Sequence, residues 1–399
     1  MASTEFTFTQ SAGTSTKKYT VSMWFKGRPL VSGTCGFWGC GTGTGDGTSL
    51  HWLDTGKFSL ETWDGSSNPK AETTRLFRDP AAWYHLVFSI DTTNATADDR
   101  LKIWINGVRE TNFGTYNTIT QDSDIPGWSG SGDVMHIGNR VLDGDSFFEG
   151  SMSHVHIIDG TIYDASAFGE TDSTSGIWVA KTSPSVTYGT NGGFYKFASG
   201  ALTTDSSGNG NTLTQVGSPT NTQDTPDNNF CTMNPLENFY SNQTFTEGNN
   251  TIKSDDPAVA TGTIGLTSGK WYWEAKCITT SVAGTAWQFG IKGNQNEGSS
   301  EYLGQHGNDY SYYGADGQSW NNGSGSSYGN TYDTGDIIGC AVDLTNNKLY
   351  FSKNGTWQNS GDPTSGSTGT GAISITNSAV DTPQGYYRPA AGANSSATK

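Results

Sequence analysis

Basic side chains are scarce in this sequence. It contains 22 Lys and Arg against 38 Asp and Glu, which gives a net charge of -16. Such a surface repels a phosphate backbone, so we expect no nucleic acid partner. The acidic residues are spread along the chain, which favours a solvated surface that keeps a large assembly soluble over carboxylate clusters that bind divalent cations.

Cysteine is also rare, with five residues and no paired Cys-x-x-Cys spacing. Neither a complete disulfide framework nor a zinc ribbon is indicated, so we expect free thiols. Cys277 and Cys340 lie in apolar alternation and are expected to be small buried hydrophobes. Cys35 and Cys40, which are close together in a Gly-rich stretch, form the one plausible bridge.

Long apolar runs are missing as well. No stretch approaches the roughly 20 apolar residues that a membrane helix needs, so we expect no membrane insertion. The start, "MASTEFTFTQ", lacks the basic and apolar regions of a secretory signal peptide. We therefore expect synthesis in a cytoplasm, with any release by a route other than general secretion.

Glycine and aromatic residues are plentiful, at 53 residues and 12%, a composition typical of many strands and tight turns. One phrase occurs twice, at residues 90–110 and 342–357. Each copy alternates apolar and polar residues and reaches an Asn-Gly pair, Asn106-Gly107 or Asn354-Gly355, which supplies the positive φ angles of a tight hairpin. We predict an all-β protein with two meanders of the same kind.

Three prolines among polar residues mark 217–235 as an extended connector. On either side lie runs of alternating strands separated by turns rich in Gly, Ser, Asn and Asp, the pattern of antiparallel sandwiches. The sequence therefore predicts two β-sandwich domains in tandem, at residues 1–216 and 236–399.

The first predicted domain contains "WYHLVFSIDTTNATADDRLKIWINGVRE" followed by "FFEGSMSHVHIIDGTIYD". With these segments, residues 1–216 resemble the laminin-G and pentraxin-like group of concanavalin-type sandwiches. The resemblance implies a jelly roll, and it leaves calcium binding through loop acids open. We otherwise expect no cofactor.

The second predicted domain contains "SGKWYWEAKC", "QFGIKG", "YGNTYDTGDIIGCAVDLTNNKLYFSKNGTW" and "YYRPAAG" in that order. It resembles a SPRY domain, whose sandwich is also concanavalin-like. The resemblance implies a closing apolar strand after Arg388-Pro389, which the sequence lacks. We therefore expect residues 386–399 to lie against further residues of a longer chain or against a strand from a neighbouring subunit.

The tandem pairing and its Thr-, Gly-, Ser- and Asn-rich surface resemble structural proteins of tailed bacteriophages, especially marine ones. This resemblance implies a non-enzymatic structural or adhesive virion protein, such as a fibre, decoration or receptor-binding subunit. It would be assembled in the host cytoplasm as a homo-oligomer and displayed on the virion surface. Its partners would be other virion subunits and a host cell-surface glycan or protein. Two alternatives stay open: a secreted or surface glycan-processing enzyme, and a cellular carbohydrate-binding adhesin.

Catalytic and metal-binding patterns are weak. A glycosidase needs two carboxylates on one strand face, but Glu61 and Asp64 are three residues apart, so we interpret them as solvated turn carboxylates. His154 and His156 would share a strand face and could hold a metal, although packed histidines are the more common case. Asp46 in "GTGTGDGT" is a weak calcium candidate, against a flexible Gly-rich turn as the alternative.

The strongest binding candidate is the stretch "DYSYYGADGQSWNNGSGSSYGNTYD". Aromatic rings beside Asn and Asp are typical of sugar or peptide recognition, because the rings cover apolar faces while the amides bind hydroxyls. Packing of the same rings in the core is the simpler explanation. The candidate ligand-binding residues are Tyr310, Tyr312, Tyr313, Trp320 and Tyr328.

Overall fold

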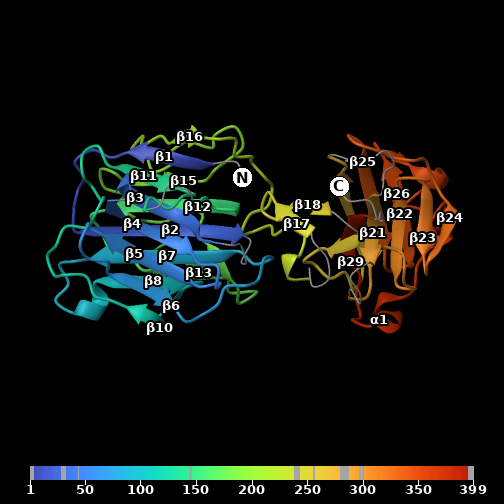
Figure 1. Ribbon diagram of the computed structural model, residues 1–399, viewed down its shortest axis with the longest axis horizontal. Helices are drawn as coiled ribbons and strands as arrows, with labels where there is room; N and C mark the ends of the chain where they lie inside the picture. The colour runs from blue at the N-terminus through green and yellow to red at the C-terminus, as the bar shows by residue number, and fades with distance from the viewer. Residues whose placement is uncertain are drawn as a thin grey trace. The chain divides into compact units, whose positions relative to one another are not determined.

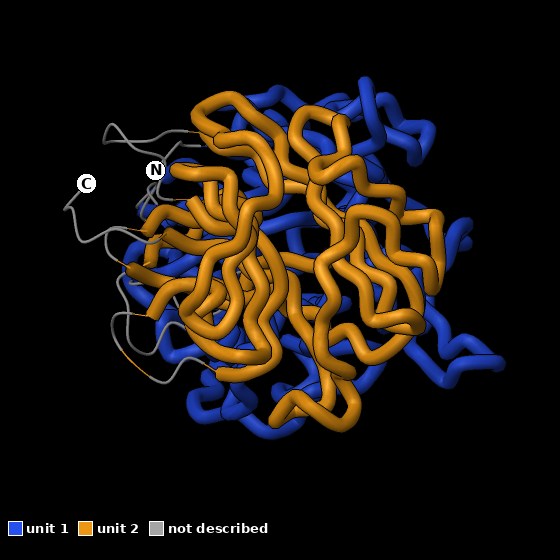
Figure 2. The backbone as a smooth tube through the Cα atoms, turned by 90° about the vertical axis from the view of Figure 1, so that its right-hand side faces the viewer, with its two compact units in different colours: residues 1–230 blue, residues 231–399 orange. Residues whose placement is uncertain are grey.

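The computed structural model describes residues 4–27, 33–43, 45–142, 146–237, 243–254, 257–278, 287–295, 298 and 301–393. The chain forms two compact units, Met1–Phe230 and Cys231–Lys399 (Figure 2). Almost all regular structure in these ranges is antiparallel strand, and the only α-helix among the described residues is α1, Ser378–Asp381 (Figure 1). The all-β prediction is confirmed.

Unit 1 has two main sheets in its described residues. The first is eight-stranded, in the order β10-β6-β5-β4-β3-β11-β1-β16. Its strands are β1 (Glu5–Thr9), β3 (Cys35–Gly43), β4 (Asp46–Trp52), β5 (Phe58–Trp63), β6 (Lys70–Thr73), β10 (Phe113–Tyr116), β11 (Val134–Ile137) and β16 (Thr214–Val216).

The second sheet of unit 1 is six-stranded, in the order β15-β12-β2-β7-β8-β9. Its strands are β2 (Lys18–Gly27), β7 (Tyr84–Asp91), β8 (Leu101–Ile105), β9 (Val108–Arg109), β12 (Gly150–Asp159) and β15 (Gly193–Tyr195). Alternate residues of β2, β7 and β8 lie in the core between the sheets. Asn106 and Gly107 have φ of 49° and 82°, so the first predicted meander is confirmed.

The opposite face of the six-stranded sheet is covered by the chain itself. The short 3-10 helix η2 (Ala165–Ala167) and the hairpin of β13 (Gly169–Thr171) with β14 (Trp178–Ala180) pack on it. We call residues 163–188 the covering segment. Its apolar side chains form a second buried cluster with Val87 and Trp104. The 3-10 helix η1 (Ala97–Asp99) connects β7 and β8.

Unit 2 is a smaller sandwich. One sheet has the order β19-β29-β21-β22-β23-β24, and the other has β20-β25-β26-β27 with β28 paired to β26. The strands are β19 (Ala258–Thr261), β20 (Lys270–Lys276), β21 (Trp287–Lys292), β22 (Asp309–Tyr313), β23 (Gln318–Asn321), β24 (Ser324–Ser327), β25 (Ile337–Asp343), β26 (Lys348–Lys353), β27 (Thr356–Trp357), β28 (Ile373–Ser374) and β29 (Arg388–Ala393).

The second meander lies in β25, β26 and β27. Ile338, Cys340 and Val342 alternate into the core of unit 2, and Asn354 turns the chain with φ of 49°. The prediction is confirmed. The unit also contains the 3-10 helix η3 (Pro235–Glu237) and a hairpin of β17 (Gln243–Thr246) with β18 (Thr251–Ser254). Two further 3-10 turns are η4 (Gln358–Ser360) and η5 (Gly366–Thr368).

The expected gap at the end of the second sandwich is not found. Strand β29 begins at Arg388 and pairs with β19 on one side and β21 on the other. The Arg388-Pro389 segment is therefore itself an inner strand, and the prediction of an unpaired edge beside it is wrong. The sequence hid this strand because it is short and built of Ala and Gly. The remaining residues, 394–399, lie outside the described ranges.

Part of the predicted connector, 217–235, makes specific contacts within unit 1. The buried ammonium of Lys26 donates to Asp224, at 2.9 Å, and to Asn229, at 2.7 Å. The indole of Trp83 donates to the other oxygen of Asp224, at 2.8 Å. The two compact units divide after these contacts, between Phe230 and Cys231.

Candidate binding face on the C-terminal sandwich

The sheet containing β20 has one face in the core of unit 2 and one face toward solvent. Tyr272 lies opposite Ala341, and Ala341 lies opposite Tyr350, so the three form a row across β20, β25 and β26. Their neighbours in sequence, Trp273 and Phe351 among them, point into the core. Because side chains alternate along a strand, the Tyr272 row lies on the outer face.

Aromatic rings gather on this outer face. The ring of Trp357 lies edge-on to Tyr272, with centroids 6.1 Å apart, and edge-on to Tyr350, with centroids 6.5 Å apart. Tyr272 is 53% exposed, whereas Tyr350 is buried. A single exposed apolar side chain is normal on a protein surface, but aromatic rings that cluster on one face are typical of an interaction site.

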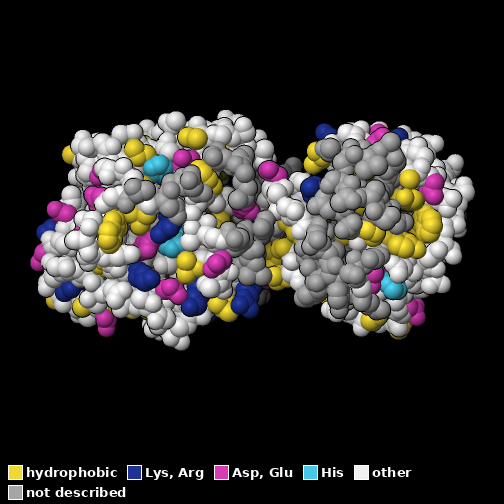
Figure 3. All heavy atoms as spheres, viewed as in Figure 1, with side chains coloured by type: hydrophobic (Ala, Val, Ile, Leu, Met, Phe, Trp, Pro, Cys, Tyr) yellow, Lys and Arg dark blue, Asp and Glu magenta, His cyan; other side chains and the backbone are white. Residues whose placement is uncertain are grey.

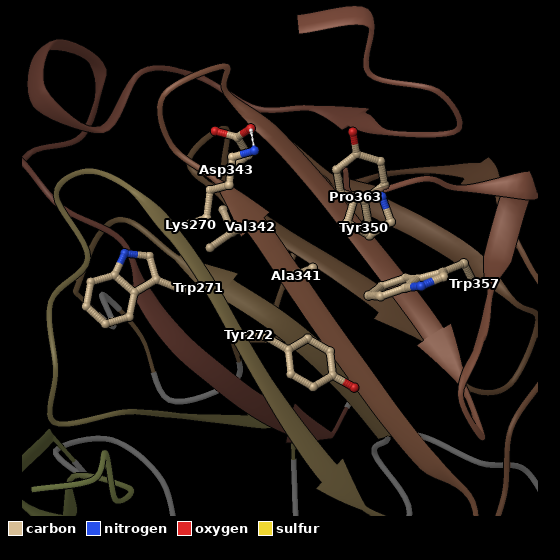
Figure 4. A pocket seen from close by; sticks show the side chains of 9 residues that line it. All are labelled: Lys270, Trp271, Tyr272, Ala341, Val342, Asp343, Tyr350, Trp357 and Pro363. Atoms are coloured by element: carbon tan, nitrogen blue, oxygen red, sulfur yellow. Dashed lines mark ion pairs between the residues drawn. The ribbon is translucent and has the colours of Figure 1, made fainter. Parts of the chain in front are cut away.

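The rings border an open pocket of about 300 Å³, shown in Figure 4. We call this surface the β20 face. It is mainly apolar, with one ion pair at its edge. The pocket is bordered by Lys270, Trp271, Tyr272, Ala341, Val342, Asp343, Tyr350, Trp357 and Pro363. Of these, Trp271 and Val342 alternate to the inner side of the sheet.

A glycine allows the Tyr272 ring to lie flat on the sheet. A Cβ on Gly339 would lie 2.6 Å from the Tyr272 hydroxyl and 2.4 Å from Ser352 Oγ. Any side chain at Gly339 would therefore push the ring outward and change the shape of the pocket.

The polar groups of the β20 face are already paired. Lys270 Nζ lies 3.4 Å from Asp343 Oδ2, the ion pair drawn in Figure 4. The Tyr272 hydroxyl donates to Glu274 Oε1 at 2.6 Å, and the Trp271 indole donates to the Ser268 carbonyl at 2.7 Å. Few hydrogen-bonding groups are left for a polar ligand.

Two pKa values reflect this pairing. Burial raises the pKa of Tyr272, and the hydrogen bond to Glu274 raises it further. Burial works to raise the pKa of Asp343, but the hydrogen bonds from Asn346 and the charge of Lys270 outweigh it, so the pKa is lowered. At neutral pH the face therefore presents a neutral phenol beside an ionised, neutralised carboxylate.

Three of the five aromatic candidates lie elsewhere, in the core. Tyr312 has no exposed surface, and Tyr310 and Tyr328 are 4% and 7% exposed. The Tyr310 and Tyr328 hydroxyls accept the backbone N–H groups of Thr376 and Phe351. No ring face of these three residues is left for a ligand. The expectation that they form a binding loop is therefore wrong, and they pack in the core, which was the alternative.

The other two candidates, Tyr313 and Trp320, are half-buried. The ring of Trp320 lies edge-on to Tyr302 and to Tyr313, with centroid distances of 6.0 and 6.1 Å. These rings belong to the other sheet of unit 2, around β22 and β23. They do not line the β20 face.

The two carboxylates of unit 1 have different surroundings. Asp64 accepts the backbone N–H groups of Ser66 and Ser67 in an exposed turn, as expected. Glu61 is 6% exposed and forms an ion pair with Arg140. The interpretation of Glu61 as a solvated turn carboxylate is wrong, because it faces a guanidinium that the sequence gave no reason to place there.

The predicted histidine pair does not share a regular strand face. The pairing of β12 with β2 shifts between Ser153 and His156, and His154 has a φ of 49°. His156 stacks on Phe194 with centroids 4.0 Å apart, and its Nδ1 lies 3.0 Å from the Tyr188 hydroxyl. His156 is thus a packed histidine.

Asp46 lies at the start of β4 in a β-hairpin. Burial raises its pKa, and the charges of Asp133 and Asp64 raise it further. Among the described residues, no group of three or more His, Cys, Asp or Glu is arranged to hold a metal ion. All five cysteines are free thiols.

The sequence analysis missed the β20 face, although one signal was present. "KWYWEAK" places aromatic residues at three successive positions, so at least one must point away from the core. Tyr272 is that residue. Tyr350 and Trp357 gave no comparable signal, because only the strand pairing brings them beside Tyr272.

Family models match both units. Residues 2–166 match the Concanavalin A-like lectin/glucanases superfamily, and residues 270–376, which contain the whole β20 face, match the SPRY domain. The chain carries a concanavalin A-like domain and a SPRY domain in tandem. The two family resemblances drawn from the sequence are confirmed.

Curated relatives match only a short part of the chain. Ran-binding protein 9 of Danio rerio is 37% identical over 97 residues, which is 24% of this chain and 16% of that protein. The human protein of that name is 36% identical over 97 residues, 24% of this chain and 13% of the relative. A Drosophila melanogaster Ran-binding proteins 9/10 homolog is 49% identical over 47 residues, 12% and 5%. The chain spans less than a fifth of these relatives.

Solved structures of both kinds are similar at low identity. A heptameric SAP-like pentraxin from Limulus polyphemus is 18% identical, covering 40% of this chain and 71% of its own, with a TM-score of 0.29. The SPRY domain of human HERC1 is 16% identical, covering 36% of this chain and 80% of its own, with a TM-score of 0.26.

In the described part of the chain, no helix has the length and apolarity that crossing a membrane requires.

Proposed function

We propose that this chain is a non-enzymatic binding protein whose SPRY domain holds a polypeptide segment on the β20 face. The observation that carries the proposal is the exposed Tyr272 ring beside Trp357 over a pocket of about 300 Å³. Interface anchors are enriched in Tyr and Trp, which bury large rings in such pockets.

The pairing of the polar groups favours a polypeptide over a glycan. A sugar needs free donors and acceptors beside the rings, but Lys270 and Asp343 pair with each other and the Tyr272 hydroxyl bonds to Glu274. Apolar or proline side chains need only the ring faces. The names of the curated relatives, which describe Ran-binding proteins, also support a protein partner.

A non-enzymatic role is supported by the state of the groups that chemistry would need. Ser22 Oγ lies 2.8 Å from His85 Nε2, but both side chains are fully buried, so no substrate reaches them. Glu61 is held by Arg140. Catalytic groups must contact a reacting atom, so the burial of the first pair and the ion pairing of Glu61 favour a binding role.

The setting of this binding is proposed from the sequence resemblance. A virion fibre, decoration or receptor-binding subunit needs a soluble surface, and Figure 3 shows acidic side chains scattered over the visible face. The relatives named above are Ran-binding proteins, so the virion setting depends on that resemblance alone. Finding this chain by mass spectrometry in purified phage particles would support it, and finding it only in cell walls or secreted fractions would favour an adhesin.

The binding proposal is tested by offering the full chain a random peptide library and a glycan array. We expect enriched peptides whose affinity falls about tenfold or more in Tyr272→Ala and Trp357→Ala, the size typical of truncated anchors. Trp320→Ala, on the other sheet, is the matched control and should bind as the wild type does. Glycan binding that requires Tyr272, or peptide binding that ignores both substitutions, would contradict the proposal.

A further inference from the structure

Strand β20 is the open edge of its sheet in the described part of the chain. Among the described residues it pairs only with β25. Its first three residues are exposed, with Trp271 at 44% and Tyr272 at 53%. A long edge strand with aromatic side chains is a template for another strand. The edge strand β24 of the other sheet differs, because its four residues are short and polar, Ser324–Ser327.

The hydrogen-bond pattern shows which backbone groups of β20 are free to pair. Gly269 O accepts from Leu344 N, and Cys277 N donates to Asp336 O, at the two ends of the β20–β25 ladder. In an antiparallel pair such bonds recur at every second residue. The odd-numbered residues between 269 and 277 therefore bond to β25. The N–H and C=O groups of Lys270, Tyr272, Glu274 and Lys276 point to the open edge.

We propose that β20 pairs with β20 of a second copy of this chain, antiparallel, about a two-fold axis at Tyr272. Only the even-numbered residues can exchange hydrogen bonds across the edge, so the pairing is restricted to registers that place even residues opposite even residues. A two-fold contact uses the same surface on both copies, as one strand pairing with itself does.

Charge complementarity favours this register, which makes two opposite-charge pairs, over those shifted toward the C-terminus. With Tyr272 opposite itself, each Lys270 lies opposite Glu274 of the second copy, which gives two pairs of opposite charge. Shifting by one step toward the C-terminus places Lys270 opposite Lys276, and a further step places Glu274 opposite Glu274. Like charges directly opposite one another destabilise a sheet, and opposite charges stabilise it.

The same register covers the exposed apolar surface of the edge. On the other face of β20, Trp271 comes to lie opposite Trp273 of the second copy. Trp273 already packs edge-on against Phe289 in the core, with centroids 6.4 Å apart. The half-exposed Trp271 is thereby joined to the end of a buried aromatic row. This interface does not depend on which ligand the β20 face holds.

The test mixes two variants that repel themselves but attract each other. Glu274→Lys places Lys opposite Lys, and Lys270→Glu places Glu opposite Glu. Sedimentation velocity of the full-length wild type should show mass that doubles as concentration rises. Each variant alone should associate about tenfold or more weakly, as expected when two opposite-charge pairs become like-charge pairs. An equimolar mixture should recover the dimer, because each Lys then faces a Glu.

Two proline variants separate pairing from folding. Glu274→Pro removes a donor that points to the open edge, so the monomer should fold while the dimer is lost. Ala275→Pro removes a bond to β25 and should lower the melting temperature. A wild type that stays monomeric up to its solubility limit would overturn the proposal, even if another polypeptide binds this edge. So would a dimer that survives both charge variants, or a mixture that stays monomeric.

Discussion

The outer sheet faces of the two sandwiches differ, because the chain covers one of them and leaves the other exposed. In unit 1 the covering segment, 163–188, lies on the six-stranded sheet, and Trp178 Nε1 donates to the buried His85 Nδ1 at 2.9 Å. In unit 2 the corresponding outer face keeps Tyr272 exposed beside a pocket. A sandwich needs only its inner faces to fold. The outer face is therefore where a chain either covers itself or leaves room for a partner.

The largest loss of stability is expected for a predicted ligand-binding residue that the structure places in the core. Tyr312→Ala removes a fully buried ring that stacks on Phe351, and we expect unit 2 to lose about 4 kcal/mol of unfolding free energy in urea. Tyr313→Ala, the neighbour on the opposite face of β22, should cost about 1 kcal/mol. Equal losses of unfolding free energy would show that the two faces of β22 do not differ in how much their side chains stabilise the sandwich.

Removing the contact that covers unit 1 should cost less than a core ring. Trp178→Ala loses the hydrogen bond to His85 and the ring stacked on it, with centroids 6.0 Å apart. We expect unit 1 to be destabilised by about 3 kcal/mol in urea. The matched control is Ile177→Ala, whose side chain is 63% exposed and should change stability by about 0.5 kcal/mol or less.

Acid should weaken unit 1 before unit 2. Burial lowers the pKa of His85 from 6.5 to about 3. Below pH 6.5 the unfolded chain therefore binds a proton at His85, whereas the folded unit does not. The contribution of His85 to the free energy of unfolding is fully present above this pH and falls as the pH decreases toward about 3. At about pH 5 the loss from His85 alone is about 2 kcal/mol.

In unit 2 the pKa of Asp343 is lowered from 3.8, so its contribution is lost only as the pH falls below that value. The measurement is urea unfolding of each unit between neutral pH and about pH 5. A unit 1 whose stability does not change over this range would show that burial does not keep His85 neutral in solution.

The smallest effect on stability is expected on the open face. Tyr272→Ala removes a ring that is 53% exposed, and we expect a change of about 0.5 kcal/mol or less in urea unfolding of unit 2. Ligand binding should nevertheless fall as described above. A loss of several kcal/mol would show that the ring supports the sandwich and that the two outer faces are alike.

The strands of both meanders could be predicted from the sequence, but the side chains that surround each residue could not. Alternation and the Asn-Gly turns placed both meanders, because period and positive φ are local properties. Burial is a property of the packed sheets, so Tyr310, Tyr312 and Tyr328 could not be told from ligand-binding rings. Strand β29 was missed because Ala and Gly carry no apolar periodicity, although its pairing on both sides closes the sheet. The row of Tyr272 and Tyr350 depends on register, which no single segment specifies.

Hydroxyl-radical footprinting of the full chain, read by mass spectrometry at concentrations where the chain is monomeric, tests the contrast between the two faces most directly. We predict rapid oxidation of Trp271 and Tyr272 on the open sheet of unit 2. Trp24, which stacks on His85 at a centroid distance of 4.8 Å beneath the covering segment, should be oxidised far more slowly. Oxidation of Tyr272 as slow as that of Trp24 would contradict the account, because the β20 face would then be covered in the isolated chain.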